Sequence, residues 1–354
     1  MNLAIMKKIK LNDFENVLII QTAFIGDVVL TLPLCKKIKE LNKNIKLNFL
    51  TTNVSNEIPK LLKVIDNVII YDKYIKDKGL KGLVKLIYQL KHNNYNIIIT
   101  PHRSIRSALI SYFSKPKYSI SFNNSSLSFL YNYTINYEFK EHEIKRNLNL
   151  LSCFEEYDNL ISFVNFNDLI FTEDTINNVN NISLKFELKY QEYILLAPGS
   201  IWNTKKWNID YFIKLIKLLN TNNLKCVLIG GKNDKSICNY ISNRVKCVDL
   251  SGITSISESI LLINNSKLLI TNDSAPIHFA GLTSTNVIAI FGPTIPEFGF
   301  SPIKKDDLII QDNNLKCRPC TIHGGNKCPI NNHKCMNNIK PEYVFEKIIN
   351  YFRR

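Results

Sequence analysis

Asp27 stands where a short apolar run, residues 17–20, has ended and a helical pattern of apolar residues begins. A carboxylate placed just after a buried strand can point into a ligand cleft and act as the general base that deprotonates a hydroxyl group. Aspartate is also favoured in the first turn of a helix, so capping is the competing interpretation. The turn before Asp27 lacks the G-x-G-x-x-G pattern of dinucleotide sites, and the chain has no G-x-x-x-x-G-K-[ST] phosphate loop.

Two loops in the second half of the chain carry groups suited to a diphosphate. Segment 197–207 combines small residues, hydroxyls and paired lysines, and segment 271–278 places Asp273 after a buried strand, at the start of a helix. Backbone N–H groups and a nearby lysine bind phosphate well. An ordinary basic loop, a helix cap at Asp273 and a packed His278 are the competing interpretations. The candidates for this diphosphate site, which becomes the donor site under the resemblance given below, are Ser200, Thr204, Lys205, Asp273, Ser274, Ala275 and His278.

Four of the nine cysteines lie close together near the end of the chain. They are Cys317, Cys320, Cys328 and Cys335, and the first two have the Cys-x-x-Cys spacing of many metal sites. Four thiolates can close a structural zinc site, with His323 and His333 as spare ligands. Free thiols or an occasional disulfide are the alternatives, and no catalytic role is expected.

The elements that would position these groups alternate between short apolar runs and longer helical patterns. Strands are predicted at 16–21, 45–50, 67–71 and 96–100, then at 193–197, 225–230, 247–249, 267–271 and 286–291. Helices are predicted at 27–41, 79–92, 104–113, 209–219, 234–245, 257–264, 275–282 and 341–351. Apolar strands that alternate with helices predict parallel sheets covered on both faces. Turns at 230–234 and 291–294 bring the strand-end loops of the second half to four, which indicates a nucleotide-binding crevice.

The length of 354 residues exceeds what one hydrophobic core usually serves, so we expect two Rossmann-like domains in series. The polar, weakly patterned stretch 173–191 is the expected boundary region, with a short strand-helix element as its alternative interpretation. We therefore assign residues 1–180 to the first domain, 181–340 to the second, and 341–354 to a final helix. Two such domains would face each other across a cleft at the carboxyl ends of their strands.

In combination, the motifs resemble glycosyltransferase family 9, the ADP-heptose:lipopolysaccharide heptosyltransferases. The resemblance covers nearly the whole chain in order and rests on IGD (25–27), TLP (31–33), APGS (197–200), KKW (205–207), IGG (229–231), TNDSAPIH (271–278) and FGPT (291–294). It implies a GT-B fold in which the first domain (1–180) binds the acceptor, the second (181–340) binds the nucleotide-sugar donor, and the last helix (341–354) returns to the first domain. It also implies inverting transfer of heptose from ADP-heptose to the inner core of lipopolysaccharide, with no metal or cofactor required for catalysis.

The resemblance also implies roles for single residues. Asp27 matches the general base, Lys205 the lysine that neutralises the leaving diphosphate, and Asp273 the acid that holds hydroxyls of the donor sugar. Ser274, Ala275 and His278 line the same loop, and the family usually has glycine where this chain has Ala275. Segments 100–108 and 142–146 resemble acceptor-facing segments, so the acceptor candidates are Arg103, Arg106 and Arg146; ordinary surface arginines are the alternative.

The charge balance favours anionic partners. Lysine and arginine total 45 against 30 acidic residues, a net charge of +15, although a solvated basic surface would give the same count. No signal peptide or membrane span is apparent. We expect a cytoplasmic monomer, peripheral at the inner face of an anionic membrane. The alternatives are a transferase that uses a UDP- or GDP-linked sugar, a sugar-nucleotide epimerase, and a basic nucleic-acid-binding protein; the scattered lysines speak against nucleic acid as a partner.

Overall fold

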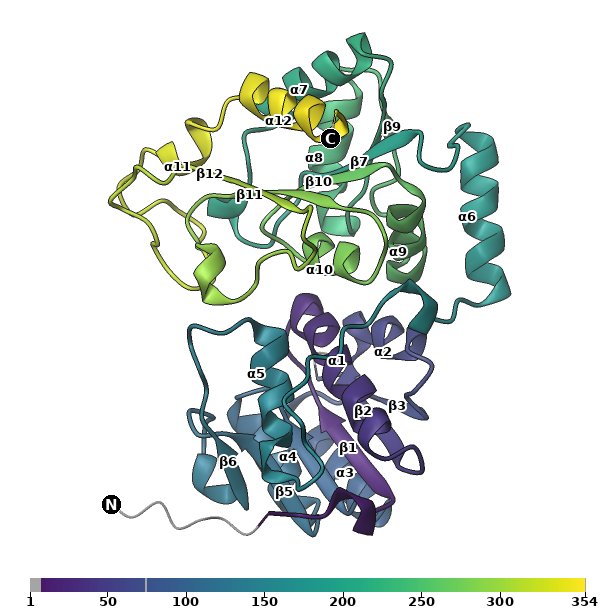
Figure 1. Cartoon of the computed structure of the whole chain (residues 1–354), viewed down its shortest axis with the longest axis vertical. Coiled ribbons are helices and arrows are strands. Elements are labelled where there is room, and N and C mark those ends of the chain that lie inside the picture. The colour runs from purple at the N-terminus through teal and green to yellow at the C-terminus, as the bar shows by residue number, and fades with distance from the viewer. Residues whose placement is uncertain (1–7, 74, 354) are drawn as a thin grey trace. The chain divides into compact units, whose positions relative to one another are not determined.

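The computed structural model describes residues 8–73 and 75–353 and divides the chain into two compact units between Ile170 and Phe171 (Figure 1). Each unit contains one six-stranded sheet in which every neighbouring pair of strands is parallel. The prediction of an α/β protein with two Rossmann-like domains is therefore confirmed. Among the helices that the structure describes, none combines the length and the apolar character needed to cross a membrane.

The first unit has the strand order β3-β2-β1-β4-β5-β6. The central strands are almost entirely buried because helices cover both faces of the sheet, which explains their continuous apolar runs. The order changes direction between β1 and β4, at the switch point where ligands bind in open parallel sheets. The strands are β1 (Asn16–Ile20), β2 (Lys46–Thr52), β3 (Asn67–Tyr71), β4 (Ile97–Thr100), β5 (Tyr118–Phe122) and β6 (Tyr133–Ile135).

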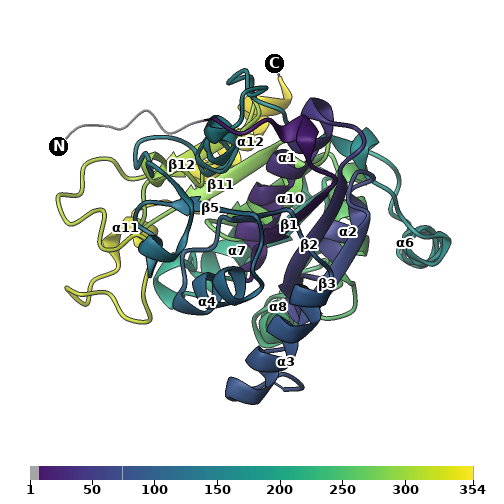
Figure 2. The same cartoon turned by 90° about the horizontal axis from the view of Figure 1, so that it is seen from below.

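The helices of the first unit lie on both sides of its sheet. Helices α1 (Ile25–Leu41) and α2 (Glu57–Leu61) lie on one side of strands β1 to β3, and α3 (Gly79–His92) and α4 (Ile105–Phe113) lie on the other (Figure 2). Leu83, Leu86 and Leu90 of α3 pack in one core cluster with residues of β1 to β4. Helix α5 (Glu143–Asn149) packs on α1, where Asn147 Nδ2 donates to Leu30 O at 3.1 Å.

The second unit has the strand order β12-β11-β10-β7-β8-β9. Its central strands are also wholly buried. The loops after β7 and β10 therefore leave neighbouring positions at the same edge of the sheet. The strands are β7 (Tyr193–Ala197), β8 (Lys225–Leu228), β9 (Val248–Asp249), β10 (Leu268–Asn272), β11 (Val287–Phe291) and β12 (Leu308–Gln311).

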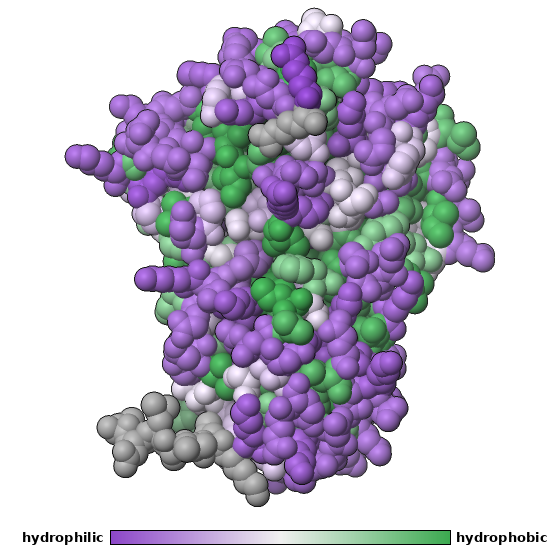
Figure 3. All heavy atoms as spheres, viewed as in Figure 1, coloured by the Kyte–Doolittle hydropathy of each residue, from purple (hydrophilic) through white to green (hydrophobic). Residues whose placement is uncertain are grey.

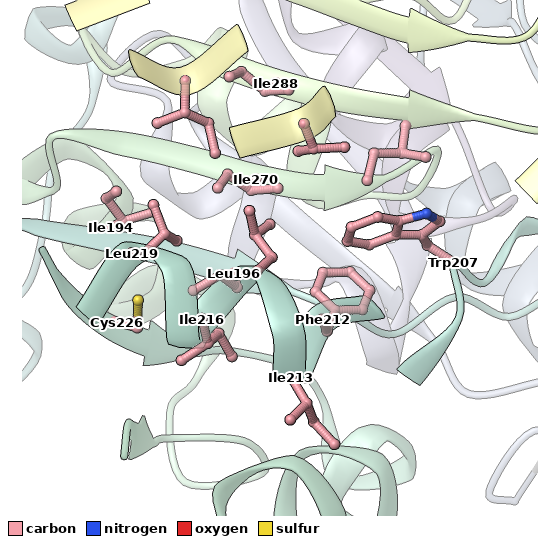
Figure 4. Packing of buried hydrophobic residues seen from close by; sticks show 14 of the residues in the cluster. Ile194, Leu196, Trp207, Phe212, Ile213, Ile216, Leu219, Cys226, Ile270 and Ile288 are labelled. Atoms are coloured by element: carbon pink, nitrogen blue, oxygen red, sulfur yellow. The ribbon is translucent and has the colours of Figure 1, made fainter. Parts of the chain in front are cut away.

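One hydrophobic core of this unit forms between its sheet and helix α7 (Figure 4). Trp207 is buried, and its ring meets that of Phe212 edge to face with 4.9 Å between the ring centres, so Trp207 anchors the 197–207 loop against the following helix. The helices are α6 (Glu173–Lys185), α7 (Ile209–Thr221), α8 (Lys235–Ser242), α9 (Ile256–Asn265), α10 (Pro276–Gly281), α11 (Lys334–Asn337) and α12 (Pro341–Phe352).

The last helix corrects one expectation. We expected the segment after residue 340 to return to the first domain, but α12 packs on α7 within the second unit. Val344 and Ile348 are completely buried there in the same core as Phe212. The apolar side of α12 is thus buried in the core of the second unit.

The division between the units also falls before the predicted one. Residue 180 lies inside α6, so the linker interpretation of 173–191 is wrong and the alternative, an element that belongs to one domain, agrees with the structure. Val179 of α6 is buried, and Asn178 Nδ2 donates to Glu258 Oε1 of α9 at 2.8 Å, so the whole helix belongs to the second unit. The face drawn in Figure 3 is mostly hydrophilic, with hydrophobic side chains in small separate patches, as expected for a chain with this charge content.

Candidate active site

Asp27 lies in the first turn of α1, directly after the carboxyl end of β1. Phe24 is the N-cap residue, and its backbone N–H forms a hydrogen bond with the Asp27 carboxylate. Thr31 Oγ1 donates to Asp27 O at 2.8 Å, and Gln21 Nε2 donates to Thr31 Oγ1 at 3.1 Å. These contacts fix the turn while the Asp27 residue stays partly accessible.

The surroundings of Asp27 raise its pKa to about 7. Burial is the main cause, because it disfavours the charged form, and the negative charge of Glu143 adds to it. The hydrogen bond from Phe24 and the positive charge of Arg103 act in the opposite direction. A carboxyl group with a pKa near neutrality can both accept and release a proton under physiological conditions, which suits general-base catalysis.

Glu143 belongs to a buried cluster on α5 and the segment before it. Arg146 Nη1 donates to Glu143 Oε2 at 2.8 Å and to the Tyr137 hydroxyl at 2.9 Å, and Arg146 Nε donates to Glu138 O at 2.9 Å. A further Arg146 donor bonds Phe139 O at 2.5 Å. Only 2% of Arg146 is exposed. This differs from the expectation that Arg146 contacts the acceptor, because its guanidinium is buried and bonds the protein itself. It holds together the cluster that contains Glu143, whose charge acts on Asp27.

Arg103 and Arg106 remain available as acceptor-binding groups. They follow β4, on the strand next to β1, and both are at least partly exposed. The Arg103 guanidinium lies 4.1 Å from the centre of the Tyr137 ring. This contact connects Arg103 with the cluster that surrounds Glu143.

His102 lies between these arginines and the end of β1. Its Nδ1 is 2.9 Å from the hydroxyls of Thr22 and of Ser107. Burial, with the positive charges of Lys73 and Arg103, lowers the pKa of His102 to about 4, so the imidazole is neutral at physiological pH. The edge of the first sheet thus presents the Asp27 carboxyl group, with a pKa near 7, together with the cationic Arg103 and the neutral His102.

In the second unit, Lys205 and Asp273 form an ion pair. Lys205 Nζ is 2.7 Å from Asp273 Oδ2, and Thr294 Oγ1 donates to the same oxygen at 2.5 Å. Asp273 is buried and Lys205 is partly exposed. An ammonium group has three N–H donors, so Lys205 can contact Asp273 and a phosphate oxygen together. The structure therefore brings together two of the residues that the sequence assigned to the donor site and adds Thr294.

Thr204 has a different place from the one expected. It is buried, its hydroxyl donates to Gly325 O at 2.9 Å, and Gly325 N donates back to it at 2.8 Å. His333 Nε2 lies 2.7 Å from Thr204 O. Thr204 therefore joins the 203–205 turn to the cysteine-rich segment instead of presenting its hydroxyl to a ligand.

Buried polar contacts also join the loops after β7 and β10. Asn272 Nδ2 donates to Pro198 O at 2.8 Å, and Asn272 Oδ1 accepts from Trp207 N at 3.0 Å. A Cβ atom at position 199 would lie 2.1 Å from Asp234 Oδ1, so a larger residue than Gly199 would displace the Asp234 side chain. The remaining candidates divide by burial, with Ser200, Ser274 and Ala275 partly exposed and His278 buried in α10.

The four clustered cysteines are free thiols in the described structure. Cys335 is buried and the other three are partly exposed, and Cys320 Sγ lies 3.3 Å from Cys317 O. Within residues 8–73 and 75–353, no group of three or more His, Cys, Asp or Glu side chains is placed to hold a metal ion. The zinc set is thus not assembled here, and zinc binding stays a prediction.

Arg318, between the first two cysteines, was missed by sequence reasoning. Its guanidinium donates to Gly292 O, to Thr294 O at 2.7 Å and to Asp312 O at 2.6 Å. The backbone of Cys320 also donates to Pro293 O at 2.9 Å. The cysteine-rich segment therefore holds the loop whose Thr294 side chain bonds Asp273. Of these residues only the 291–294 turn gave a signal in the sequence, because it follows a buried strand.

The model of glycosyltransferase family 9 (heptosyltransferase) matches residues 83–327 of this chain. The chain belongs to glycosyltransferase family 9. It is 31% identical over 206 residues to lipooligosaccharide heptosyltransferase 2 of Campylobacter jejuni, an alignment that covers 52% of this chain and 62% of that protein. The chain thus matches about three-fifths of the length of this relative. The corresponding Haemophilus influenzae enzyme is 23% identical over 368 residues, which cover 94% of this chain and 98% of that one.

Solved structures of the family share the fold. A family 9 glycosyltransferase from Veillonella parvula superimposes with a TM-score of 0.84 at 17% identity, covering 97% of this chain and 98% of that one. Escherichia coli ADP-heptose lipopolysaccharide heptosyltransferase II gives a TM-score of 0.75 at 18% identity, covering 95% and 98%. The predicted family and the GT-B fold are therefore confirmed.

Proposed function

We propose that this protein transfers a heptose from ADP-heptose to the core of a lipooligosaccharide or lipopolysaccharide, with inversion at the anomeric carbon. The observation that carries this proposal is Asp27, a partly accessible carboxyl group with a pKa near 7 at the end of β1, in a chain of this family. The names of the Campylobacter and Haemophilus relatives support the reaction, and that of the Escherichia coli structure supports the donor.

In the proposed reaction, Asp27 accepts the proton of an acceptor hydroxyl. The hydroxyl oxygen attacks the anomeric carbon, and the bond between that carbon and the diphosphate oxygen breaks. ADP leaves with the bonding electron pair, and the positive charge of Lys205 offsets the negative charge that develops on it. No bound metal or cofactor takes part in these steps.

The surrounding residues orient the two substrates. Asp273, fixed by Thr294, accepts hydrogen bonds from hydroxyls of the donor sugar, and Ser200, Ser274 and Ala275 line the diphosphate. Arg103 and Arg106 bind phosphate or carboxylate groups of the acceptor, because a guanidinium can donate two parallel hydrogen bonds. Since the acceptor is part of a glycolipid, we place the enzyme at the inner face of the cytoplasmic membrane, as a peripheral monomer.

Calorimetric binding of ADP, UDP and GDP to the full chain tests the donor site. We expect selective binding of ADP and a loss of about ten-fold or more in affinity in Lys205→Ala, because a charge-assisted contact to phosphate disappears. Lys206→Ala is the matched control: Lys206 Nζ donates to Asn203 Oδ1 at 3.0 Å, and we expect near wild-type binding. Preferential binding of UDP or GDP would mean that the donor is a different nucleotide sugar. Equal losses of ADP affinity in both variants would refute the role of Lys205.

Transfer from ADP-heptose to a heptose-deficient core acceptor tests the base. We expect Asp27→Ala to lose activity by about 100-fold or more, the usual contribution of general-base catalysis, while the affinity for ADP stays unchanged. If Asp27→Ala retains most of its activity, the proposed base is wrong even when the donor site is right.

A further inference from the structure

Helix α3 has an apolar side that the core does not use. Leu83, Leu86 and Leu90 face the sheet, whereas Leu80 is 79% exposed, Val84 63% and Tyr88 66%. Residues four apart lie one above the other on a helix, so these three exposed side chains form one continuous stripe. We call this stripe, together with the lysines described next, the outer face of α3.

The polar part of the outer face is wholly basic. Lys78, Lys81, Lys85 and Lys91 are exposed along it, and no aspartate or glutamate occurs in the sequence between Asp77 and Glu138. On a helical projection the lysines at 81 and 85 lie beside the stripe, and Lys91 lies within it. An ordinary solvated helix alternates charges of both signs, so the absence of acidic residues over this length sets α3 apart.

This combination has the chemistry of an interfacial helix. Helices that lie in the plane of a bilayer place leucine and aromatic side chains among the acyl chains and lysines among the headgroups. A lysine can keep its ammonium in the headgroup layer while its methylene stem contacts the apolar region, which accommodates Lys91 within the stripe. The Tyr88 ring, 4.3 Å from the His92 ring, has the amphipathic character that favours this boundary.

The surroundings of the outer face extend the same surface. Helix α3 lies on the opposite side of the sheet from α1, which carries Asp27 (Figure 2). The exposed aromatic residues Tyr112 and Phe113 end the neighbouring helix α4, which packs on α3. Lys115 and Lys117 follow directly and are also exposed.

We propose that the outer face of α3 is the surface by which this protein docks on an anionic lipid bilayer. The proposal rests on the proposed function for its location and goes beyond it by naming the surface. Anionic headgroups supply negative charge to balance the four exposed lysines. The apolar side chains of the stripe insert reversibly among the acyl chains. The contact is peripheral, because one helix side of this size gives weak and exchangeable binding.

Co-sedimentation of the full chain with vesicles tests this directly. We expect binding to vesicles of phosphatidylethanolamine and phosphatidylglycerol, little binding to phosphatidylcholine vesicles, and weaker binding at high salt. Combined Leu80→Asn, Val84→Asn and Tyr88→Asn should reduce the affinity about ten-fold or more, because the apolar contact disappears. Combined Lys81→Gln, Lys85→Gln and Lys91→Gln should have an effect of similar size, about ten-fold or more, through lost attraction to the headgroups.

A matched control carries the same kind of apolar change elsewhere. Ile176, Leu184 and Tyr190 are exposed in the second unit, and their combined substitution by Asn should leave vesicle binding unchanged. Thermal unfolding followed by circular dichroism, measured in parallel, should be the same in all variants and shows that both units are folded. The affinity for ADP should also be unchanged. It also separates this proposal from the donor site, since a protein that binds no ADP can still bind vesicles.

Four outcomes would overturn the proposal. The first is a wild-type chain that does not sediment with anionic vesicles, and the second is that the α3 variants bind as well as the wild type. The third is equal binding to neutral and anionic vesicles at every salt concentration. The fourth is a chain that binds no vesicles but forms a concentration-dependent dimer, which only the apolar α3 variant abolishes. The last result would assign the stripe to a second copy of the chain.

Discussion

Asp27 shows how one residue's environment sets both a reactivity and a stability. Burial and Glu143 raise the pKa of Asp27 from 3.8 to about 7. The folded chain therefore holds a proton at Asp27 that the unfolded chain releases at lower pH. Between these two values the folded state loses stability as the pH rises, because the unfolded state is then the one that ionises freely. The property that suits Asp27 to its proposed role as a base thus weakens the fold at neutral pH and above.

The substitution Asp27→Asn should reveal this cost. Above pH 7 it should raise the free energy of unfolding by up to about 4 kcal/mol, since a neutral amide replaces a carboxylate in a desolvating site, and the gain should vanish below pH 4. Urea unfolding at several pH values measures it. Asp210→Asn, an exposed first-turn carboxylate on α7, is the control and should change little. A gain of the same size at every pH would contradict the explanation.

Arg103 should tune the base. Its positive charge lowers the pKa of Asp27, so Arg103→Gln should move the midpoint of the pH profile of kcat/KM upward from about 7. Arg106→Gln is the control, because Arg106 is not among the groups that shift Asp27; it should raise KM for the acceptor without moving the midpoint. If both variants keep the wild-type midpoint, the profile reports a group other than Asp27.

The sequence identified the residues at strand ends but not their partners. Asp27, Lys205 and Asp273 could be predicted because each follows a recognisable apolar run in a family motif. The bond from Thr294 to Asp273 joins segments that are distant in sequence, and Arg146 is buried because the chain folds back on itself. Local spacing in the sequence does not encode such contacts. Arginine in an acceptor-like motif was therefore assigned to a ligand although it bonds the protein itself.

At the scale of elements, burial decided what could be predicted. Strands β3 and β7 were predicted with their observed bounds because they are bounded apolar runs. The three-residue strand β6 is only half-buried and lacks such a run. Helix α6 was not the preferred prediction for its segment, because its sequence is rich in asparagine, a poor helix former, and buries only Val179. The Thr172 cap and packing on α9 stabilise this helix.

The cysteine-rich segment is an irregular element with a positioning role. Arg318 holds the 292–294 backbone, Thr294 bonds Asp273, and Asp273 pairs with Lys205. We expect Arg318→Gln to lower the affinity for ADP by about ten-fold, since a half-buried guanidinium that bonds several carbonyls is lost. Arg244→Gln is the control, because Arg244 is exposed and its guanidinium donates to Tyr240 O of the preceding helix α8.

Calorimetry with ADP measures both arginine variants. Arg318→Lys keeps the charge but not the fork of donors, so it should restore only part of the affinity. Full affinity in Arg318→Gln would show that the Lys205–Asp273 pair does not need this support.

At the scale of the whole molecule, each unit has its own sheet and its own core. A fragment of residues 171–354 should therefore fold alone and bind ADP with nearly the affinity of the full chain. A fragment of residues 181–354 cuts α6, removes Val179 and Asn178, and should melt at lower temperature because the contact with α9 is lost. Thermal unfolding followed by circular dichroism compares the two. Equal melting temperatures would show that α6 adds nothing to the second unit.

The packing of α12 on α7 has a consequence for how such enzymes can change over generations. Because the last helix completes the second unit, everything from residue 171 onward is one uninterrupted cassette. A single recombination event at that joint could attach this second unit to another first unit without breaking either core. Had the last helix crossed back, the same exchange would have needed two coordinated joints. Under the proposed function, the connectivity of this chain thus favours diversification of the acceptor while the donor chemistry is inherited whole.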